Sequence, residues 1–335
     1  MTPVTQVTLI GVGGMARWHI RQMLKMPEST AIAVVCEPSE KQYAESCKLF
    51  AEAGLEPPPN QPNLDKLLQE YKDRLDAAFI ITPHAYHHDQ TAACMESGLD
   101  VLLEKPMVIN AAEARSLINV RDRTGKLMVV AFPGSLSPRI RKAVQMYKNG
   151  ELGKLQGISA TAWQSWGENT VGTWRQQPEI SGGGFLFDTG AHMLNTVVDL
   201  ACEEFVEIAA WMDFNDRPVE TESVVIGKLA SGAMVTLHGA GETAPSCASD
   251  IYAFYSRAIM RTGIWGEKLE LQGDAENVFF PVEVPASLGV WEQFLAVRNG
   301  QMANPCPPEV GLRMAKLYDA IKESSSKHGA VVKCG

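Results

Sequence analysis

Apolar and polar residues along the first 130 positions predict strands and helices in alternation. Short apolar runs, typical of strands buried in a parallel sheet, are each followed by a stretch of helical periodicity. The expected strands are Val4 to Ile10, Ala31 to Cys36, Asp76 to Ile81, Asp100 to Leu103 and Lys126 to Ala131. The expected helices run from the first strand's loop to about Lys25, from Ser39 to Ala53, from Leu64 to Tyr71, from the loop after Ile81 to Ser97, and from Asn110 to Arg123. This order predicts an α/β domain.

The second half of the chain has a different pattern. Alternating strands are expected at Lys154 to Trp166, Val206 to Asp213, Glu222 to Leu229, Ala233 to Gly239 and Ile259 to Leu271, with helices at Leu136 to Lys148, Phe185 to Leu200, Ala286 to Asn299 and Glu309 to Ser324. A short tail with a possible last strand follows from Lys327. Such a run of hairpins predicts one antiparallel sheet with a helical layer on one face. We expect two domains, residues 1–132 and 133–335, with C-terminal helices able to pack back on the first.

The first strand enters a glycine-rich loop, Gly11, Val12, Gly13, Gly14, Met15 and Ala16, which opens a helix. The first glycine allows the tight turn, the second lets a pyrophosphate approach the backbone, and the small Ala16 lets the helix pack on the strand. Glu37 ends the second strand about twenty residues later, where an acid accepts hydrogen bonds from the adenosine ribose. The pattern favours NAD over NADP, because Glu37 repels a 2′-phosphate. Ordinary turn glycines and a solvated acid remain the alternatives.

Two further strand ends carry candidate chemistry. Thr82, Pro83, His84, His87 and His88 follow the third strand, and no further ligand at the usual spacing accompanies the histidines, so no metal site is expected. Glu104, Lys105 and Pro106 follow the fourth. A lysine at the carboxyl end of a parallel strand points into the crevice where ligands bind such sheets, and its cation can stabilise an alkoxide. A surface lysine is the alternative.

The stretch from Ser181 to His192, SGGGFLFDTGAH, is the expected centre of the chemistry. Its three glycines allow close approach of backbone to backbone or ligand. On a helix from Phe185, the residues Asp188, His192, Asn195 and Asp199 share one face. A carboxylate and an imidazole four residues apart can transfer a proton, can form half of a metal site, or can simply lie on a solvated helix face. Gly190 inside this helix indicates that something approaches that turn closely.

Aromatic residues precede this stretch. Trp163 and Trp166 lie on a strand, where they face opposite sides, so at most one is expected to face a cleft. Trp174 and Arg175 follow closely. An aromatic ring can stack on a sugar and Arg175 can hydrogen-bond its hydroxyl groups, whereas as core or interface groups they need no substrate.

Composition limits the class of protein. The chain has 335 residues, 45% hydrophobic and 21% charged, as in a soluble protein of about two domains. A formal net charge of −9 argues against nucleic acid as the main partner, although a local basic pocket can override it. Seven cysteines without a CxxC pair are typical of reduced cytoplasmic thiols, and no stretch is apolar enough to cross a bilayer or resembles an export signal.

These motifs together resemble the glucose-fructose oxidoreductase, inositol dehydrogenase and MocA family of nicotinamide-dependent oxidoreductases. The matching pieces are the glycine loop from Gly11 to Ala16, Thr82-Pro83 with His87, Glu104-Lys105-Pro106, Trp174-Arg175, and the run from Gly182 to His192. They stand in the family's order over most of the chain. Ala16 replaces a third glycine, and His84 stands where an asparagine is frequent.

The resemblance implies an N-terminal Rossmann domain and an α+β domain with a large open, mainly antiparallel sheet that assembles homodimers or homotetramers. It implies that Lys105, Asp188 and His192 are catalytic, with hydride transfer between nicotinamide and a secondary alcohol or ketone of a sugar, polyol or cyclitol. Cofactor contacts are then expected from Gly11, Gly13, Gly14, Met15, Ala16, Glu37, Thr82, Pro83, His84, His87, Glu104 and Lys105. Substrate contacts are expected from Lys105, Trp163, Trp174, Arg175, Asp188 and His192. A glycosidase that retains its NAD and a non-catalytic nucleotide-binding regulator are the alternatives.

Overall fold

The chain folds into two compact units, and the computed structural model describes residues 3–273 and 277–334. The first unit consists of Met1–Val108, Ala112–Ala131 and Leu288–Glu309, and the second of Ile109–Ala111, Phe132–Ser287 and Val310–Gly335. Both units are therefore built from segments that are separated in the sequence, and each is described by itself below.

The first unit contains a parallel sheet of five strands, in the order β2-β1-β3-β4-β5. The strands are β1 (Thr5–Ile10), β2 (Thr30–Cys36), β3 (Ala77–Ile80), β4 (Asp100–Leu103) and β5 (Met128–Val130). β3 and β5 are buried along their whole length, which explains why they read as continuous apolar runs. The predicted α/β domain with a parallel sheet is confirmed.

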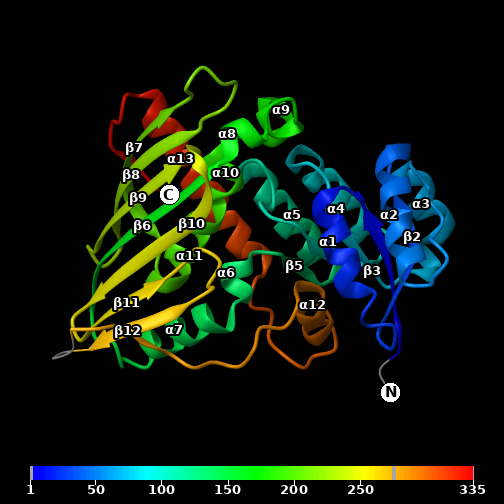
Figure 1. Cartoon of the computed structure of the whole chain (residues 1–335), viewed down its shortest axis with the longest axis horizontal. Helices are drawn as coiled ribbons and strands as arrows, with labels where there is room; N and C mark the ends of the chain where they lie inside the picture. Colours follow the sequence, from blue (N-terminus) through cyan, green and yellow to red (C-terminus); the bar gives the residue numbers. More distant parts are fainter. Residues whose placement is uncertain (1–2, 274–276, 335) are drawn as a thin grey trace. The chain divides into compact units, whose positions relative to one another are not determined.

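Helices surround this sheet (Figure 1). They are α1 (Gly14–Met23), α2 (Glu40–Glu52), α3 (Leu64–Tyr71), η1 (Lys72–Arg74), η2 (His84–Tyr86), α4 (His87–Glu96), α5 (Ala111–Thr124) and α12 (Val290–Arg298). α12 belongs to this unit although it lies far along the chain. Trp291 on α12 donates a hydrogen bond from Nε1 to Oγ1 of Thr30 at 2.7 Å, and Arg298 donates from Nε to Oδ2 of Asp100 at 2.9 Å.

The second unit contains a sheet of nine strands, in the order β13-β12-β11-β10-β6-β9-β8-β7-β14. All neighbours are antiparallel except β6 and β9, which are parallel. The strands are β6 (Leu155–Ser165), β7 (Phe205–Asp213), β8 (Glu222–Leu229), β9 (Met234–Ala240), β10 (Glu242–Tyr255), β11 (Ala258–Thr262), β12 (Leu269–Gly273), β13 (Phe280–Pro281) and β14 (Val332–Lys333). The predicted large, mainly antiparallel sheet is confirmed.

Helices pack on one face of this sheet, where α11 contacts β6 and α10 contacts β8 and β9 (Figure 1). The helices of the unit are α6 (Pro133–Leu136), α7 (Pro138–Lys148), α8 (Trp166–Asn169), η3 (Trp174–Gln176), α9 (Pro178–Ser181), α10 (Phe185–Asp188), α11 (Gly190–Ala201) and α13 (Pro308–Ser326). Exposure alternates along β8, where Val225 is buried and its neighbours Val224 and Ile226 are more than 40% exposed. The sheet therefore has one covered and one open face.

The structure departs from the predicted elements in several places. The expected strand from Ile259 to Leu271 is two strands, β11 and β12, joined by a turn that includes Gly266 at φ +68°. β10 was not predicted, because its first half has no regular alternation of apolar residues. The expected helix from Phe185 to Leu200 is divided at Thr189 into α10 and α11, and that from Leu136 to Lys148 begins at Pro138. A proline favours the first turn of a helix, which explains the later start.

Across residues 3–273 and 277–334, we find no helix with the length and apolar character needed to cross a membrane. Within the same residues, His, Cys, Asp and Glu side chains form no group of three or more able to hold a metal ion. Of the expected C-terminal tail from Lys327, Gly335 lies outside the described residues.

Candidate active site

The glycine-rich loop lies between β1 and α1, at the carboxyl end of the parallel sheet. Gly11 has a φ of +86°, and a Cβ there would lie 2.8 Å from the carbonyl oxygen of Ile81, so only glycine fits beside the end of β3. Apart from their chain neighbours and the backbone of α1 itself, Cβ atoms added to Gly13 and Gly14 would have no described atom within 4 Å. The loop therefore leaves open space at the N-terminus of the ten-residue α1, as a bound pyrophosphate requires.

Glu37 is attached to this loop. Its Oε2 accepts a hydrogen bond from the backbone N–H of Val12 at 2.9 Å, and its Oε1 accepts one from the N–H of Ser39 at 2.8 Å. A carboxylate oxygen has two lone pairs, so each retains a second acceptor position. Ala16 is fully buried, as its predicted role between helix and strand requires. The acid and the open glycine turn thus adjoin, which fits the binding of a dinucleotide.

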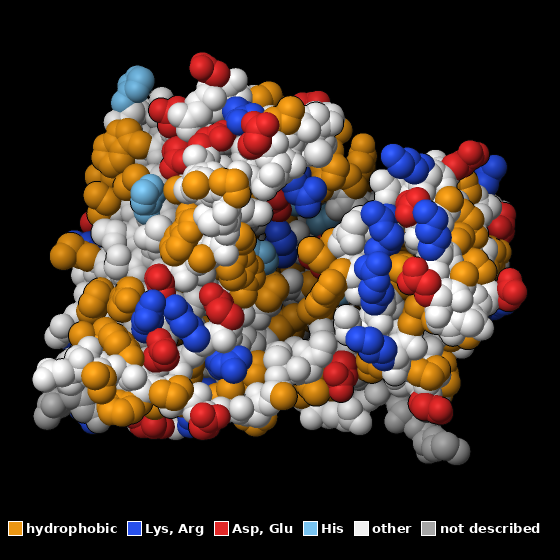
Figure 2. Space-filling model, in the orientation of Figure 1, with side chains coloured by type: hydrophobic (Ala, Val, Ile, Leu, Met, Phe, Trp, Pro, Cys, Tyr) orange, Lys and Arg blue, Asp and Glu red, His pale blue; other side chains and the backbone are white. Residues whose placement is uncertain are grey.

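Basic side chains gather on the surface over α1 and α2 of this unit (Figure 2). Arg17 on α1 donates from Nη1 to the Val12 carbonyl oxygen at 3.2 Å and to Oε1 of Gln42 on α2 at 2.5 Å. Its cation therefore lies beside the glycine loop. A locally basic surface accompanies the candidate phosphate site even though the whole chain is acidic.

Glu104 and Lys105 follow β4 directly. Oε1 of Glu104 lies 2.6 Å from Nε2 of His19, and its Oε2 accepts the backbone N–H of Lys105 at 3.1 Å. Burial alone raises the pKa of the Glu104 carboxyl, but the hydrogen bond from His19 and the charges of His19 and Lys105 outweigh burial and hold the pKa below its usual value. Glu104 is therefore a carboxylate at neutral pH, and His19 donates to it.

His87, at the start of α4, is fully buried. Its Nδ1 lies 2.9 Å from the carbonyl oxygen of Pro106, and its Nε2 lies 2.8 Å from that of Thr82. Burial lowers the pKa of His87 despite these two acceptors. His84 is also buried, with its ring centre 5.8 Å from that of His87. His84 and His87, which were both predicted to contact the cofactor, thus lie in the packed end of the parallel sheet.

In the second unit, the three consecutive glycines lie against other parts of the protein. Cβ atoms on Gly183 and Gly184 would collide with the Tyr318 hydroxyl and the Glu220 backbone, and Gly182 has a φ of +76°. Gly184 N–H donates to Oε2 of Glu220 at 2.7 Å, and the Tyr318 hydroxyl donates to its Oε1 at 3.0 Å. Burial raises the pKa of Glu220. Glycine is therefore required at these positions because the segment before α10 packs tightly against Tyr318 and Glu220.

Gly190 has a similar explanation. A Cβ there would lie 2.8 Å from Cδ1 of Leu186 and 3.3 Å from the carbonyl oxygen of Phe185. The close approach predicted for this turn is made by the preceding helix α10, so it gives no independent evidence for a ligand.

Asp188 ends α10 and is 6% exposed. Its Oδ2 accepts a hydrogen bond from Nε1 of Trp166 at 3.0 Å and from Nε of Arg175 at 2.9 Å. The Arg175 guanidinium also lies over the Trp174 ring, 4.5 Å from its centre. The structure therefore joins Asp188 to Arg175 and Trp166, and Trp174 lies against Arg175. A buried carboxylate held by a cation and an indole N–H has a fixed orientation.

His192 lies in the first turn of α11 and is 7% exposed. Its ring contacts Phe132, with centres 6.3 Å apart, and Trp265, with centres 5.9 Å apart. Thr189, between Asp188 and His192, donates from its hydroxyl to Oε1 of Gln164 on β6 at 3.0 Å. Packing and this hydrogen bond together hold the helix start that carries both candidate catalytic groups.

Asn195 and Asp199, the rest of the predicted polar face, serve a different purpose. Arg313 on α13 forms an ion pair with Asp199 and donates from Nη2 to Oδ1 of Asn195 at 2.9 Å. The Ser135 hydroxyl donates to Oδ2 of Asp199 at 2.6 Å. This part of the face holds α11 against α6 and α13.

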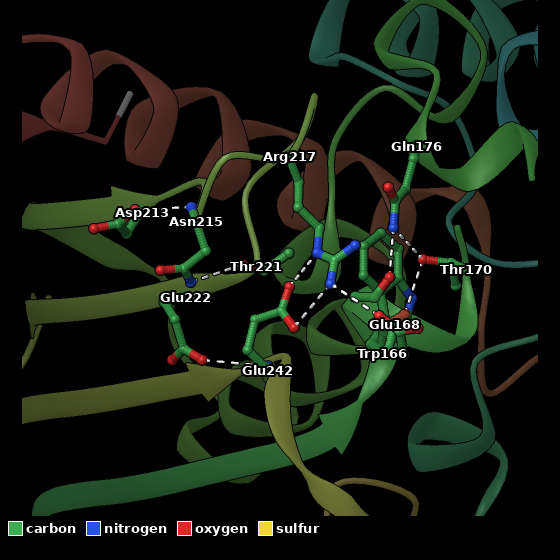
Figure 3. A network of polar contacts seen from close by, with 11 residues as sticks. Trp166, Glu168, Thr170, Gln176, Asp213, Asn215, Arg217, Thr221, Glu222 and Glu242 are labelled. Carbon is green, nitrogen blue, oxygen red and sulfur yellow. Dashed lines mark hydrogen bonds and ion pairs between the residues drawn. The ribbon is translucent and has the colours of Figure 1, made fainter. Parts of the chain in front are cut away.

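A polar network supports the segment that carries Trp166 and Arg175 (Figure 3). Arg217, in the loop between β7 and β8, forms an ion pair with Glu242 and lies 3.5 Å from Glu168 on α8. Gln176 donates from Nε2 to the Gly167 carbonyl oxygen at 2.6 Å and to Oγ1 of Thr170 at 2.9 Å. These contacts fix α8 and η3 to each other and to β10.

Trp163 lies on the face of β6 opposite to Gln164, because adjacent residues of a strand point to opposite sides. Since Gln164 contacts Thr189 on the helical side, Trp163 faces the open side of the sheet. Sequence reasoning considered Trp166 only as one of two aromatic rings that could face a cleft, and it gave no role to Trp265 or His19. In the structure these three residues contact Asp188, His192 and Glu104, respectively. Asp188 lies 22 residues from Trp166 along the chain, and Glu104 lies 85 residues from His19, so local sequence spacing cannot reveal these contacts.

The fold and these sites define a class of protein. A parallel five-stranded sheet with an open glycine turn and an acid at the end of β2 is a dinucleotide-binding unit, and it is combined with a unit built on an open sheet. Lys105 belongs to the first unit, and Asp188 and His192 belong to the second.

Family comparisons identify the chain more closely. Residues 5–132 match the model of an oxidoreductase family with an NAD-binding Rossmann fold, and residues 140–268 match the GFO/IDH/MocA C-terminal domain. The chain therefore belongs to the GFO/IDH/MocA oxidoreductase family, as the sequence motifs indicated. Its first unit is an NAD-binding Rossmann unit.

Individual proteins are similar over different lengths. Oxidoreductase P35 of Formosa agariphila is 26% identical over 204 residues, which are 60% of each chain. D-glucoside 3-dehydrogenase of Escherichia coli is 27% identical over 123 residues, 37% of this chain and 35% of that protein. This chain thus matches less than two thirds of the length of either relative. A structure of levoglucosan dehydrogenase in complex with NADH and levoglucosan has a TM-score of 0.84 at 19% identity, over 99% of this chain and 100% of that one. At that identity the likeness shows the fold alone.

Proposed function

We propose that this protein is an NAD-dependent oxidoreductase that interconverts a secondary alcohol and a ketone on a sugar, polyol or cyclitol. The observation that carries the proposal is the Asp188 site, a buried carboxylate oriented by Trp166 and Arg175, four residues before His192. The family match supports the cofactor, and the names of relatives that act on D-glucosides and levoglucosan support the substrate class.

The chain's residues divide the work as follows. Gly13, Gly14 and the N-terminus of α1 bind the pyrophosphate, and Glu37 accepts hydrogen bonds from the adenosine ribose. NAD, when bound, supplies a hydride acceptor at C4 of its nicotinamide. His192 takes the proton of the substrate hydroxyl in oxidation and returns it in reduction, which suits an imidazole because its ordinary pKa is about 6.5.

Lys105 and Asp188 assist this proton transfer. The Lys105 ammonium holds the reacting oxygen and favours its anionic form, an electrostatic effect of about 3 kcal/mol when such a group is removed. Asp188 orients the substrate, and the ion pair with Arg175 fixes the orientation of its carboxylate for that role. Trp174 and Arg175 contribute a stacking face and a hydrogen-bond donor for hydroxyl groups.

A substrate screen tests the proposal. Sugars, cyclitols and polyols are incubated with NAD or NADP, and reduced nicotinamide is followed by its absorbance. We expect NADH formation with members of this set, loss of turnover in His192→Ala with NAD affinity retained, and normal turnover in the matched His88→Ala control. Equal loss of turnover and NAD binding in His192→Ala contradicts the assigned role. NAD-dependent release of a leaving group without net NADH would identify a glycosidase instead.

The open sheet face supports assembly into a homodimer or homotetramer. Trp211, Val224, Ile226 and Met234 on β7, β8 and β9 are each more than 40% exposed, and Trp211 is paired with Val224 across the strands. Exposed apolar side chains on adjacent strands are typical of protein interfaces. Ile226→Glu is expected to shift the molecular mass measured by light scattering to that of one chain, and an unchanged mass would contradict assembly through this face.

A further inference from the structure

Two buried histidines hold the backbone on either side of Lys105, and the proposed chemistry uses neither of them. His19 lies on α1 and His87 on α4, so they reach the end of β4 from different elements of the first unit. Both are nearly inaccessible to solvent, with 3% and 0% exposure. Their hydrogen bonds within the protein therefore show which parts of the chain they hold in place.

His19 restrains the N-terminal side of Lys105. It donates from Nε2 to Oε1 of Glu104 at 2.6 Å, and its ring packs on Phe79 of β3 with centres 4.6 Å apart. The other oxygen of Glu104 accepts the backbone N–H of Lys105 at 3.1 Å. The carboxylate thus transmits the position of His19 to the Lys105 backbone. A buried carboxylate that accepts two hydrogen bonds is held more firmly than a solvated one.

His87 restrains the C-terminal side. Its two ring nitrogens lie 2.9 Å from the Pro106 carbonyl oxygen and 2.8 Å from that of Thr82. A neutral imidazole donates one of these hydrogen bonds and an imidazolium donates both. The ring therefore connects the segments that follow β3 and β4, which carry Thr82 and Lys105.

We propose that His19 and His87 are positioning residues that fix the Glu104-Lys105-Pro106 backbone so that the Lys105 ammonium is presented from a defined point. The inference rests on the proposed role of Lys105 for its catalytic consequence. The reason is geometric, because a displacement of about 1 Å in a catalytic group lowers turnover by up to about 100-fold. A lysine side chain is a flexible four-carbon chain, so the backbone is the only part of Lys105 that can be held rigidly.

Paired variants separate positioning from simple packing. His19→Gln retains an amide donor at the place of Nε2, whereas His19→Leu removes it. His87→Gln keeps at most one of the two contacts, because one amide nitrogen cannot reach both carbonyl oxygens. His88→Leu is the matched control, since the neighbouring His88 contacts Ser116 and Asp89 and makes neither of these contacts to the Lys105 segment.

Two measurements are made on the full-length chain: steady-state kinetics and hydrogen exchange of the Lys105 amide. We expect His19→Leu and His87→Gln to lower kcat by about 10-fold or more while KM and NAD affinity change less than about twofold. The Lys105 amide is expected to exchange about 10-fold faster in His19→Leu, because its acceptor loses its support. His19→Gln is expected to restore both values, and His88→Leu to change neither.

The outcomes distinguish this inference from the proposed function. Wild-type kcat and wild-type Lys105 exchange in both His19→Leu and His87→Gln overturn the inference. If His19→Leu does not fold, His87→Gln with unchanged kcat overturns it alone. If Lys105→Ala retains full turnover, the proposed role of Lys105 fails, and unchanged amide exchange in His19→Leu still overturns the backbone restraint while faster exchange supports it.

Discussion

Replacing Trp166 by phenylalanine tests whether the indole N–H is what orients Asp188. Trp166 is 2% exposed, and its Nε1 lies 3.0 Å from Oδ2 of Asp188. A hydrogen bond to a buried charged group contributes about 2 kcal/mol to stability. The change from indole to phenyl also leaves a cavity of roughly 40 Å³, which costs about 1 kcal/mol. We therefore expect Trp166→Phe to lower the free energy of unfolding by about 3 kcal/mol.

The assay is urea unfolding followed by circular dichroism, with turnover measured in parallel. Trp163→Phe is the matched control, because it removes the same atoms from a partly exposed ring on the open face of β6. We expect that control to lose less than about 1 kcal/mol of unfolding free energy. Trp166→Phe is expected to lose turnover as well as stability, since Asp188 then keeps the Arg175 contact but not the Trp166 one.

If both variants lose the same free energy of unfolding, this reasoning is refuted, because the hydrogen bond to Asp188 would then contribute nothing to stability. Full turnover in a destabilised Trp166→Phe would separate the two effects and would show that the orientation of Asp188 does not limit the reaction.

Three further predictions concern other parts of the chain. Gly184→Ala is expected to destabilise the protein by about 3 kcal/mol in thermal unfolding, because its Cβ would collide with the Glu220 backbone. Gly13→Ala has open space at its Cβ, so it should leave stability nearly unchanged and weaken NAD binding measured by calorimetry. Burial raises the pKa of Glu220 above 4.5 in the folded protein, so the wild type loses stability as pH rises from about 4.5 toward the folded pKa. The stability of Glu220→Gln relative to wild type should therefore increase over that pH range. A pH-independent difference between the two in urea unfolding would contradict this. Burial raises the pKa of the Cys94 thiol to about 12, so a thiol reagent should label the exposed Cys247 first, and faster labelling of Cys94 in mass spectrometry would be the opposite result.

The parallel sheet was predictable because its signals are local. Each apolar run from β1 to β5 is bounded by residues that end strands, and the glycine spacing of the loop after β1 is itself the signal. β10 was missed for the same reason. Its first residues, Glu242 to Cys247, include a proline and are largely exposed, and regular alternation begins only near Ala248.

The site was predictable as a set of residues and not as a set of contacts. The spacing of Asp188 and His192 indicated chemistry, but nothing near them in sequence indicates that Trp166 donates to Asp188 or that Glu220 receives the Gly184 N–H. The three glycines were expected to allow close approach of backbone or of a ligand, and Gly190 was expected to have a close neighbour. The neighbours prove to be Ile109, Tyr318, Glu220 and Leu186, which pack there only once the chain has folded.

The discontinuity of the first unit has a consequence for its synthesis. Thr30 finds its partner in Trp291, and Asp100 finds its partner in Arg298, so the nucleotide-binding unit lacks a helix until nearly the whole chain has left the ribosome. A recombinant fragment ending at residue 132 would expose the surface that α12 covers. An isolated module would need residues 288–309 joined to it by a designed linker, and a chain truncated before Leu288 would lose part of its first unit as well as its end.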